Sequence, residues 1–289
     1  MKTAKITKRL VECSVMIALA TVLSMLKLAE MPYGGSVTLA SMLPMIVISY
    51  RYGMLWGFGA GAVYAAIQQL LGLNNLSYVT GWQSVLAVII LDYMLAFASV
   101  CLGGVFRGRL AARSGSAGSA QARELALGAA LVCLVRYTLH TIAGATVWAG
   151  LSIPTEAALI YSLGYNATYM IPETLVNTLA IVYLGSIIDF TKPMPERFRK
   201  VKIGSQGAEL LYMLAPYASA LVAICGVIVD ALLLFPYLQD PESGAFTGAY
   251  LAEVNWVALG IVTGACLIIS LALVIIPRLA RSTGAGGNE

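Results

Sequence analysis

Long apolar runs with almost no charge dominate the chain. We place them at about 11–29, 37–50, 53–72, 82–106, 125–149, 163–188, 209–236 and 255–277. Most approach the length of roughly 20 residues that an α-helix needs to cross a bilayer. Their hydrophobicity is continuous, whereas the strands of a membrane barrel alternate between apolar and polar residues. The runs therefore predict an all-α fold, a polytopic membrane helix bundle.

The composition excludes several other classes of protein. Hydrophobic residues make up 59% of the chain and charged residues 11%, against roughly a quarter charged in soluble domains. The five cysteines lie in apolar runs without metal-ligand spacing, so we expect no disulfide, metal or cofactor. The net charge of +4 resides in the loops, so no nucleic-acid partner is expected. No Walker A phosphate loop is present, so we expect no ATP hydrolysis and no enzyme.

The basic residues predict the orientation of the helices. All but two of the 18 Lys and Arg lie at the N-terminus or after the second, fourth, sixth and eighth runs. The links after the first, third, fifth and seventh runs contain no Lys or Arg. Cytoplasmic loops carry the excess of positive charge. We therefore predict eight spans in the cell membrane, with both termini cytoplasmic.

Polar side chains at membrane depth are the strongest functional signal. A charge at the bilayer centre costs about 2.5–3.5 kcal/mol on insertion scales and needs a partner. Asp92, Arg136 and Glu173 all fall within apolar runs. Asp92 either pairs with Arg136 as a structural contact or faces the cation of a ligand. Glu173 could neutralise Arg136 instead, which would leave Asp92 free.

Aromatic residues converge on the same half of the predicted bundle. Any one of them could be a packing or membrane-interface residue. Together with Asp92, His140 and Asn166, however, they point to the outer half of the bundle. Aromatic faces attract a desolvated cation by about 0.5–2 kcal/mol each. The pattern indicates a pocket for a flat, cationic, nitrogen-rich molecule. The aromatic residues are Tyr64, Tyr78, Trp82, Tyr93, Trp148, Tyr161 and Tyr165.

Five motifs carry a family resemblance over about residues 8–190. They are ECSVMIALATVLS, VTLASMLPMIVISYRYG, LDYMLAF, HTIAGATVW and YSLGYNATYMIPE. The chain resembles the thiamine-specific substrate-binding subunits, or S-components, of energy-coupling-factor vitamin transporters. The resemblance implies a six-helix fold that binds thiamine from outside. It also implies partners, a transmembrane coupling protein and two ATPase subunits, which drive delivery inward.

The resemblance assigns roles to individual side chains. Trp148 and His140 would flank the aromatic rings of thiamine, and Tyr161 and Asn166 would bond its aminopyrimidine. Asp92 stands where the family has glutamate and would contact the cationic part. Four aromatic residues would make further contacts. They are Tyr64, Trp82, Tyr93 and, in an outer lid, Tyr33.

The resemblance also implies a docking surface on the first helix. Ser14 and Ala18 form a small-x-x-x-small pair, and small residues allow close helix approach in lipid. This pair would contact the coupling protein. Packing within the bundle is the alternative role for the same residues.

The chain departs from the family pattern in ways that leave alternatives open. Aspartate at position 92 is one methylene shorter than glutamate, so the ligand is thiamine or a related pyrimidine or thiazole compound. The last two apolar runs lie beyond the six spans that complete the family fold. We therefore divide the chain into a substrate-binding domain, 1–190, and a basic loop with a two-span extension, 191–289. The alternatives are a standalone carrier of a related cationic amine, and a scaffold whose intramembrane charges are only structural.

Overall fold

The computed structural model describes residues 2–31, 34–79, 81–109, 117–148, 158–198, parts of 218–238, and 250–285. Tyr33, the predicted lid residue, lies outside these ranges. The chain forms two compact units. The first contains Met1–Arg197, and the second contains the described parts of Phe198–Leu238 and Ala249–Glu289. Each unit is described by itself below.

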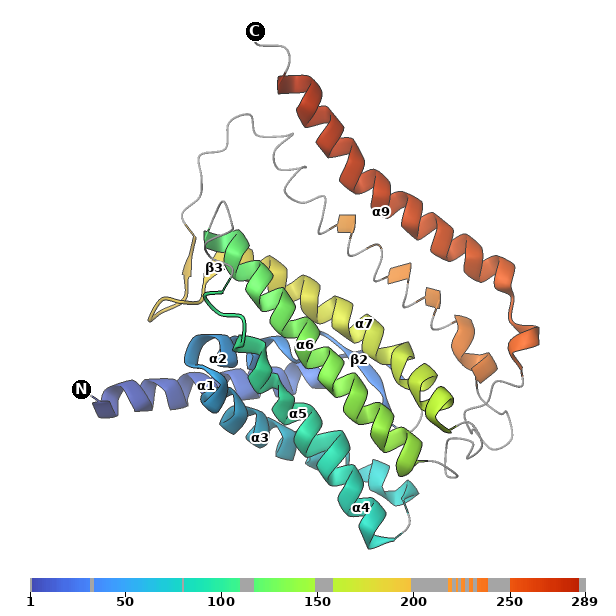
Figure 1. The fold of residues 1–289 in the computed structure, drawn as a ribbon, viewed down its shortest axis with the longest axis horizontal. Helices are drawn as coiled ribbons and strands as arrows, with labels where there is room; N and C mark the ends of the chain where they lie inside the picture. The colour runs from blue at the N-terminus through green and yellow to red at the C-terminus, as the bar shows by residue number, and fades with distance from the viewer. Residues whose placement is uncertain are drawn as a thin grey trace. The chain divides into compact units, whose positions relative to one another are not determined.

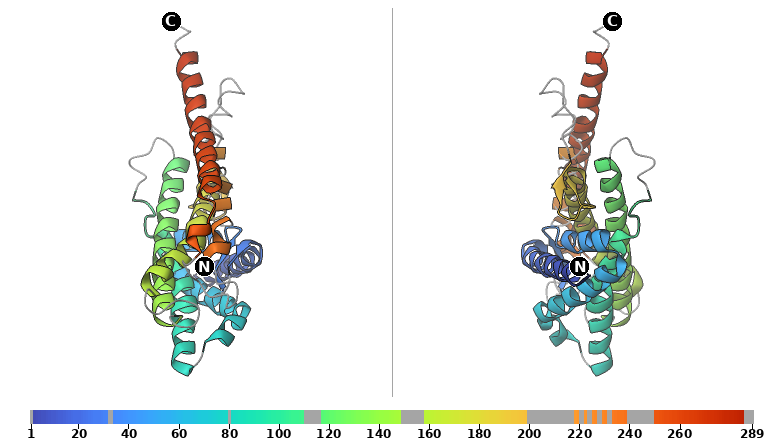
Figure 2. Two further views of the ribbon diagram at one scale, coloured as in Figure 1. Left: turned by 90° about the vertical axis from the view of Figure 1, so that its right-hand side faces the viewer. Right: turned by 90° about the vertical axis from the view of Figure 1, so that its left-hand side faces the viewer.

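The first unit is helical, with two short antiparallel strand pairs. Its longest helices, α6 and α7, lie side by side (Figure 1). In the views of Figure 2, α1 and α6 lie on opposite sides of the unit. The elements are α1 (Lys2–Met25), β1 (Lys27–Glu30), β2 (Ser36–Thr38), α2 (Leu43–Tyr52), α3 (Met54–Leu71), α4 (Trp82–Val88), α5 (Ala96–Ala98), α6 (Ala117–Thr146), α7 (Ala158–Ile187), β3 (Ile188–Asp189) and β4 (Glu196–Arg197).

Five helices of the described chain are long and apolar enough to cross a membrane. They are Met54–Leu71, Trp82–Gly104, Ala117–Thr146, Ala158–Ile187 and Trp256–Leu273. This confirms an all-helical, multi-pass architecture. The predicted total of eight spans stays a prediction. The first two predicted runs do form helices, α1 and α2, but neither is among the five.

Helix α2 forms the centre of the first unit. It has 10 residues, and Pro44–Arg51 are all buried. It contacts α1, α3, α6 and α7. It also packs against the 3-10 segment Ser99–Gly104. Glycine at position 104 permits this approach, because a Cβ there would lie 2.3 Å from the backbone oxygen of Ser49. Small residues allow such backbone approach within membrane bundles.

The span at 82–104 is not a regular α-helix. After α4 the chain passes through a π-helical turn, Ile89–Leu95, then α5, and then a 3-10 segment, Ser99–Gly104. π-Turns within helices occur frequently at functional sites. The turn contains Asp92 and Tyr93, so the irregular backbone lies where the sequence predicts ligand contacts.

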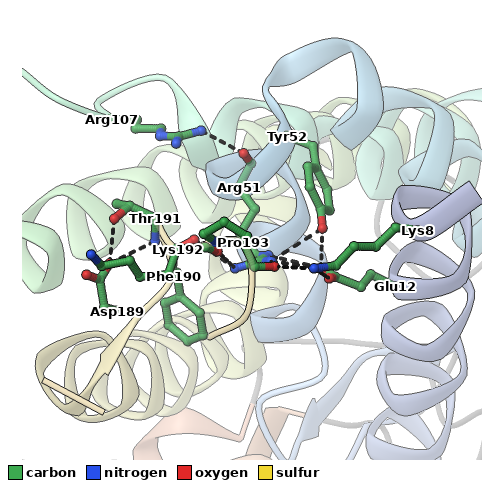
Figure 3. A network of polar contacts seen from close by, with 10 residues as sticks. All are labelled: Lys8, Glu12, Arg51, Tyr52, Arg107, Asp189, Phe190, Thr191, Lys192 and Pro193. Carbon is green, nitrogen blue, oxygen red and sulfur yellow. Dashed lines mark hydrogen bonds and ion pairs between the residues drawn. The ribbon is translucent and has the colours of Figure 1, made fainter. Parts of the chain in front are cut away.

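A polar clamp closes the end of the unit at which α2 ends (Figure 3). The buried guanidinium of Arg51 donates to Glu12 of α1 at 2.9 and 3.2 Å. The Tyr52 hydroxyl also donates to Glu12. Arg51 thereby joins α1, α2 and the turn after α7. Its carbonyl acceptors in that turn are Phe190 at 2.8 Å, Lys192 at 3.2 Å and Pro193 at 3.3 Å.

The second unit contains α9 (Trp256–Ala285) and shorter described segments. Ser219 and Ser270 exchange hydrogen bonds, each hydroxyl donating to the other's carbonyl at 2.9 and 3.0 Å. The Thr263 hydroxyl donates to Asp230 at 2.6 Å. Asp230 falls within the apolar run predicted at 209–236. Within the described residues, the other carboxylate oxygen of Asp230 has no hydrogen-bond partner.

We expect Arg51→Met to destabilise the first unit. The substitution removes the two guanidinium donors of Glu12 and the donor of three carbonyls, and breaking a buried ion pair costs about 3–5 kcal/mol. The melting temperature of detergent-solubilised protein should fall by on the order of 10 °C. Arg109→Met, at an exposed position after the 3-10 segment, is the matched control and should leave it unchanged. Equal melting temperatures for the two variants would contradict a stabilising clamp.

Candidate functional site

A cavity of about 530 Å³ lies inside the first unit. It lies where α1 and α3 end, beside the β1–β2 hairpin. This end of the first unit is opposite the end that holds the Arg51 clamp. Ser24 and Leu71 mark these helix ends in its wall. Pockets for small molecules span about 300–1,000 Å³. The cavity therefore has the size of a vitamin-binding site.

Asp92 and two groups from the α6 region form the polar centre of the wall. The Asp92 carboxylate lies 2.8 Å from His140 Nδ1 and accepts from Trp148 Nε1 at 3.1 Å. The π-turn carries Asp92, whereas His140 lies in α6 and Trp148 just beyond its end. A carboxylate fixes the tautomer and the orientation of the imidazole that bonds to it. His140 thus donates through Nδ1 and keeps Nε2 as an acceptor.

Glu173 of α7 holds the β1–β2 hairpin, and Asn177 next to it holds the residue that precedes α2. Its carboxylate accepts from the Thr38 backbone N–H at 2.6 Å and lies 2.7 Å from the Thr38 hydroxyl. One turn further along α7, Asn177 accepts from the Met42 N–H at 3.1 Å and donates to Glu173 at 3.1 Å. Glu173 is 3% exposed and lines the cavity. One side chain therefore joins the cavity floor to the hairpin.

Two glycines let the hairpin lie against the cavity wall. Gly34 has φ +108°, and a Cβ there would meet Asn75 Nδ2 at 2.4 Å. A Cβ at Gly35 would lie 2.7 Å from the Tyr169 ring. Asn75 in turn donates to the Tyr93 hydroxyl at 3.0 Å. The residues after β1 thus touch the wall on both sides, as a lid over the cavity would.

Asn166 is anchored by its own neighbours on α7. Its amide nitrogen donates to the Ser162 carbonyl at 2.8 Å, and its oxygen accepts from the Tyr169 hydroxyl at 2.5 Å. Asn166 is 4% exposed. Both ends of the amide therefore bond to protein, and Asn166 fixes the Tyr169 ring in the cavity wall.

Arg136 does not have the partner that the sequence suggested. Within the described residues no ion pair joins it to Asp92 or Glu173, and Asp92 pairs with His140 instead. The guanidinium lies 4.4 Å from the centroid of the Phe97 ring and donates to the Met42 sulfur. The predicted pair of Arg136 with Asp92 is therefore wrong, whereas Glu173 interacts with the Arg136 charge without a direct contact. The cause is geometric: the π-turn directs Asp92 to His140, and the hairpin occupies Glu173.

The structure brings most of the predicted ligand residues to one cavity. Trp82 is 72% exposed and lies outside the cavity lining. Tyr161 does not line the cavity but packs against the core cluster that contains Trp148. Ser14 and Ala18, the predicted docking pair, are exposed on α1. The predicted residues that line the cavity are Tyr64, Asp92, Tyr93, His140, Trp148 and Asn166.

Tyr165, one of the aromatic residues that the sequence placed at the predicted pocket, also lines the cavity. Tyr169 and Glu173, which were not predicted as ligand contacts, follow it at four-residue intervals on the same face of α7. That spacing is visible in the sequence and could have identified them. Asn75 and Gln68 also line the cavity. They lie near the end of α3 at Leu71 and beyond it, where the sequence has no periodic signal.

A polar and aromatic cavity among membrane-crossing helices defines a membrane protein that binds a small solute. The family is shown by comparison of sequences. Residues 10–190 match the sequence model of the family described as "Thiamine transporter protein (Thia_YuaJ)". The chain belongs to this thiamine transporter family, which confirms the resemblance in its motifs. This is a family of transporters, not of enzymes.

Individual relatives agree with this assignment. The thiamine transporter ThiT of Bacillus subtilis (strain 168) is 30% identical over 187 residues, which cover 64% of this chain and 93% of that protein. A solved structure of ThiT from Listeria monocytogenes is similar in fold, with a TM-score of 0.51 and 24% identity. It covers 61% of this chain and 92% of the Listeria chain. The family match ends at residue 190.

We expect Glu173→Gln to loosen the hairpin. A glutamine keeps one acceptor oxygen and turns an amide donor toward the donors that the carboxylate now serves. An unsatisfied buried group costs about 1–3 kcal/mol. Hydrogen–deuterium exchange at Thr38 and Met42 should therefore become at least about tenfold faster. Glu30→Gln, at an exposed hairpin carboxylate, is the control, and equal exchange in both variants would contradict the anchoring role.

Proposed function

We propose that the chain captures thiamine in this cavity as the substrate-binding subunit of a vitamin importer. The observation that carries the proposal is the Asp92 carboxylate, held between His140 and Trp148 in the cavity wall of a thiamine-transporter family member. Thiamine joins a cationic thiazolium to an aminopyrimidine. If both carboxylates are ionised, Asp92 and Glu173 carry two negative charges and Arg136 carries one positive charge. Together these three groups give the wall a net charge of about −1. A monovalent cation neutralises it.

The aromatic residues of the wall suit the rings of this ligand. Trp148 and Tyr93 belong to one buried cluster, and the Tyr64 ring meets Phe97 edge to face at 5.5 Å between centroids. Such faces stabilise a desolvated cation by about 0.5–2 kcal/mol each. We assign the thiazolium to the space beside Trp148, Tyr93 and Asp92. Tyr161 packs against the buried cluster that contains Trp148.

Thiamine should quench the tryptophan fluorescence of the purified protein, and Trp148→Ala should remove most of the signal. Asp92→Asn should weaken binding at least about 30-fold, since truncating one partner of a buried charge pair costs about 2–5 kcal/mol. Trp82→Ala is the matched control because Trp82 is exposed outside the cavity, and it should bind as the unmodified protein does. A folded sample that shows no thiamine-dependent signal would refute the proposed function.

We further propose that delivery requires a coupling partner that docks on α1. Val11, Val15 and Val22 are exposed on the same face of α1 as Ser14 and Ala18. This apolar face with a small centre suits a transmembrane helix of a coupling protein. Two ATPase subunits would supply the energy. The positions of the basic loops support a cell-membrane location with cytoplasmic termini.

Ala18→Trp should abolish thiamine uptake by cells while leaving thiamine binding by the purified protein unchanged. The bulky side chain would hold a docking helix away from α1 without reaching the cavity. Val63→Trp, at an exposed position on α3, is the control and should retain uptake. Uptake that persists in cells lacking the coupling ATPases would overturn the coupled mechanism in favour of a standalone carrier.

We assign capture to residues 1–190 and regard 191–289 as an added membrane unit. The family match to residues 10–190 and the division of the chain near Arg197 support this boundary.

A further inference from the structure

Arg9 of α1 carries a charge that no carboxylate of the described residues pairs with directly. The nearest carboxylate along α1 is that of Glu12, which pairs with Lys8 and Arg51. Glu12 also accepts from the Tyr52 hydroxyl in the Arg51 clamp (Figure 3). Its oxygens are therefore already occupied. Arg9 itself is only partly buried, so its side chain reaches the surroundings of the protein.

Two aromatic rings hold Arg9 instead of a carboxylate. Its guanidinium carbon lies 5.4 Å from the centroid of the Tyr52 ring and 5.7 Å from that of the Trp56 ring. At such distances an aromatic ring attracts a cation. The ring centroids are 6.3 Å apart, one at the end of α2 and the other in the first turn of α3. Within the described residues no hydrogen bond from Arg9 to protein accompanies these contacts, so its N–H donors remain available to an anion.

These residues lie at a boundary between polar and apolar surface. On α1, the segment before Arg9 is basic, whereas the large exposed side chains after it, such as Leu10 and Val15, are apolar. On α3, Leu55 is 84% exposed next to Trp56. Tryptophan is enriched at membrane–water interfaces, where the lipid headgroups lie. Arg9 therefore lies at headgroup depth, beside surface that faces acyl chains.

The charge of this end of α1 favours an anion. The first 12 residues contain four basic residues, Lys2, Lys5, Lys8 and Arg9, and one acidic residue, Glu12, which gives a net charge of +3. Lys5 is exposed and lies four residues before Arg9, so the two side chains share one face of the helix. Anionic lipids attract basic segments at the membrane surface.

We propose that Arg9 and Lys5 bind the phosphate of an anionic phospholipid. Tyr52 and Trp56 hold the guanidinium in place and form the wall beside the headgroup. A guanidinium can bind two phosphate oxygens at once through its planar fork of donors. The occupant is a lipid because the exposed apolar side chains beside the site pack along acyl chains, which a soluble phosphate compound lacks. The bound lipid joins α1 to the junction of α2 and α3. None of these residues lines the cavity, so the site is separate from the ligand site.

Binding of dioleoylphosphatidylglycerol to the detergent-solubilised full chain tests the proposal, with native mass spectrometry over a lipid titration as the measurement. Arg9→Gln and Lys5→Gln should each weaken binding about fivefold, and the double variant about 25-fold, because each removes one charge beside the anionic headgroup. Dioleoylphosphatidylcholine has no net charge and should bind at least about tenfold more weakly to the unmodified protein. Equal affinities for the two lipids would refute a site for an anionic headgroup.

Two further variants distinguish a site from general attraction by surface charge. Arg109→Gln removes an exposed basic residue that lies over no aromatic ring in the described structure. It should weaken binding less than about twofold, since salt screens exposed charges that are not in contact with the headgroup. Trp56→Leu keeps every charge but removes one wall of the site, and should weaken binding about threefold. If Arg109→Gln weakened binding as much as Arg9→Gln, surface charge alone would explain the attraction and the site would be wrong.

Inorganic phosphate identifies the source of the bound phosphate group. Excess inorganic phosphate should leave most of the phosphatidylglycerol bound, because the ion makes no acyl-chain contacts. Complete displacement would overturn the lipid as the occupant in favour of a soluble phosphate compound. The melting temperature without added lipid checks that each variant is folded. Lys5→Gln, at an exposed position, keeps the test available where Arg9→Gln does not fold.

Discussion

Polar groups enclosed by membrane helices must find partners on neighbouring helices, and this requirement organises the molecule. A bilayer offers no water to an unpaired carboxylate or amide. Glu173 therefore bonds to the backbone of the hairpin, Asp92 to His140 and Trp148, and Arg51 to Glu12 and the turn after α7. Each of these contacts joins segments far apart in sequence.

The buried helix α2 connects two of these polar sites. Asn177 and Glu173 hold the residues where α2 begins, at the cavity. Arg51 holds its other end in the clamp. A short helix anchored at both ends by other segments keeps the cavity floor and α1 in fixed relation. The cavity and the exposed face of α1 are thus parts of one packed body.

Much of the site was predictable because its residue types are rare at membrane depth. Asp92, His140, Trp148 and Asn166 stand out from apolar surroundings, and the structure gathers them in one cavity. Trp82 was expected among them but is exposed. The sequence could not predict this, because an aromatic residue at the start of a helix has the same pattern whether it faces a ligand or the surroundings. Boundaries were less predictable: α6 begins at Ala117, in a Gly/Ser-rich stretch that has no hydrophobic signal.

By itself, the sequence determined the membrane class, the position of most helices, the family and most of the residues that line the cavity. These follow from local hydrophobicity and from residue types that lipid does not tolerate. Only the tertiary structure decided which charge pairs with which. Arg136 could reach either carboxylate on a helical diagram. In the structure Asp92, on the π-turn, bonds to His140, and Glu173 bonds to the hairpin, so neither carboxylate contacts Arg136 directly. Hydrogen-bond partners depend on three-dimensional proximity, which spacing along one helix does not specify.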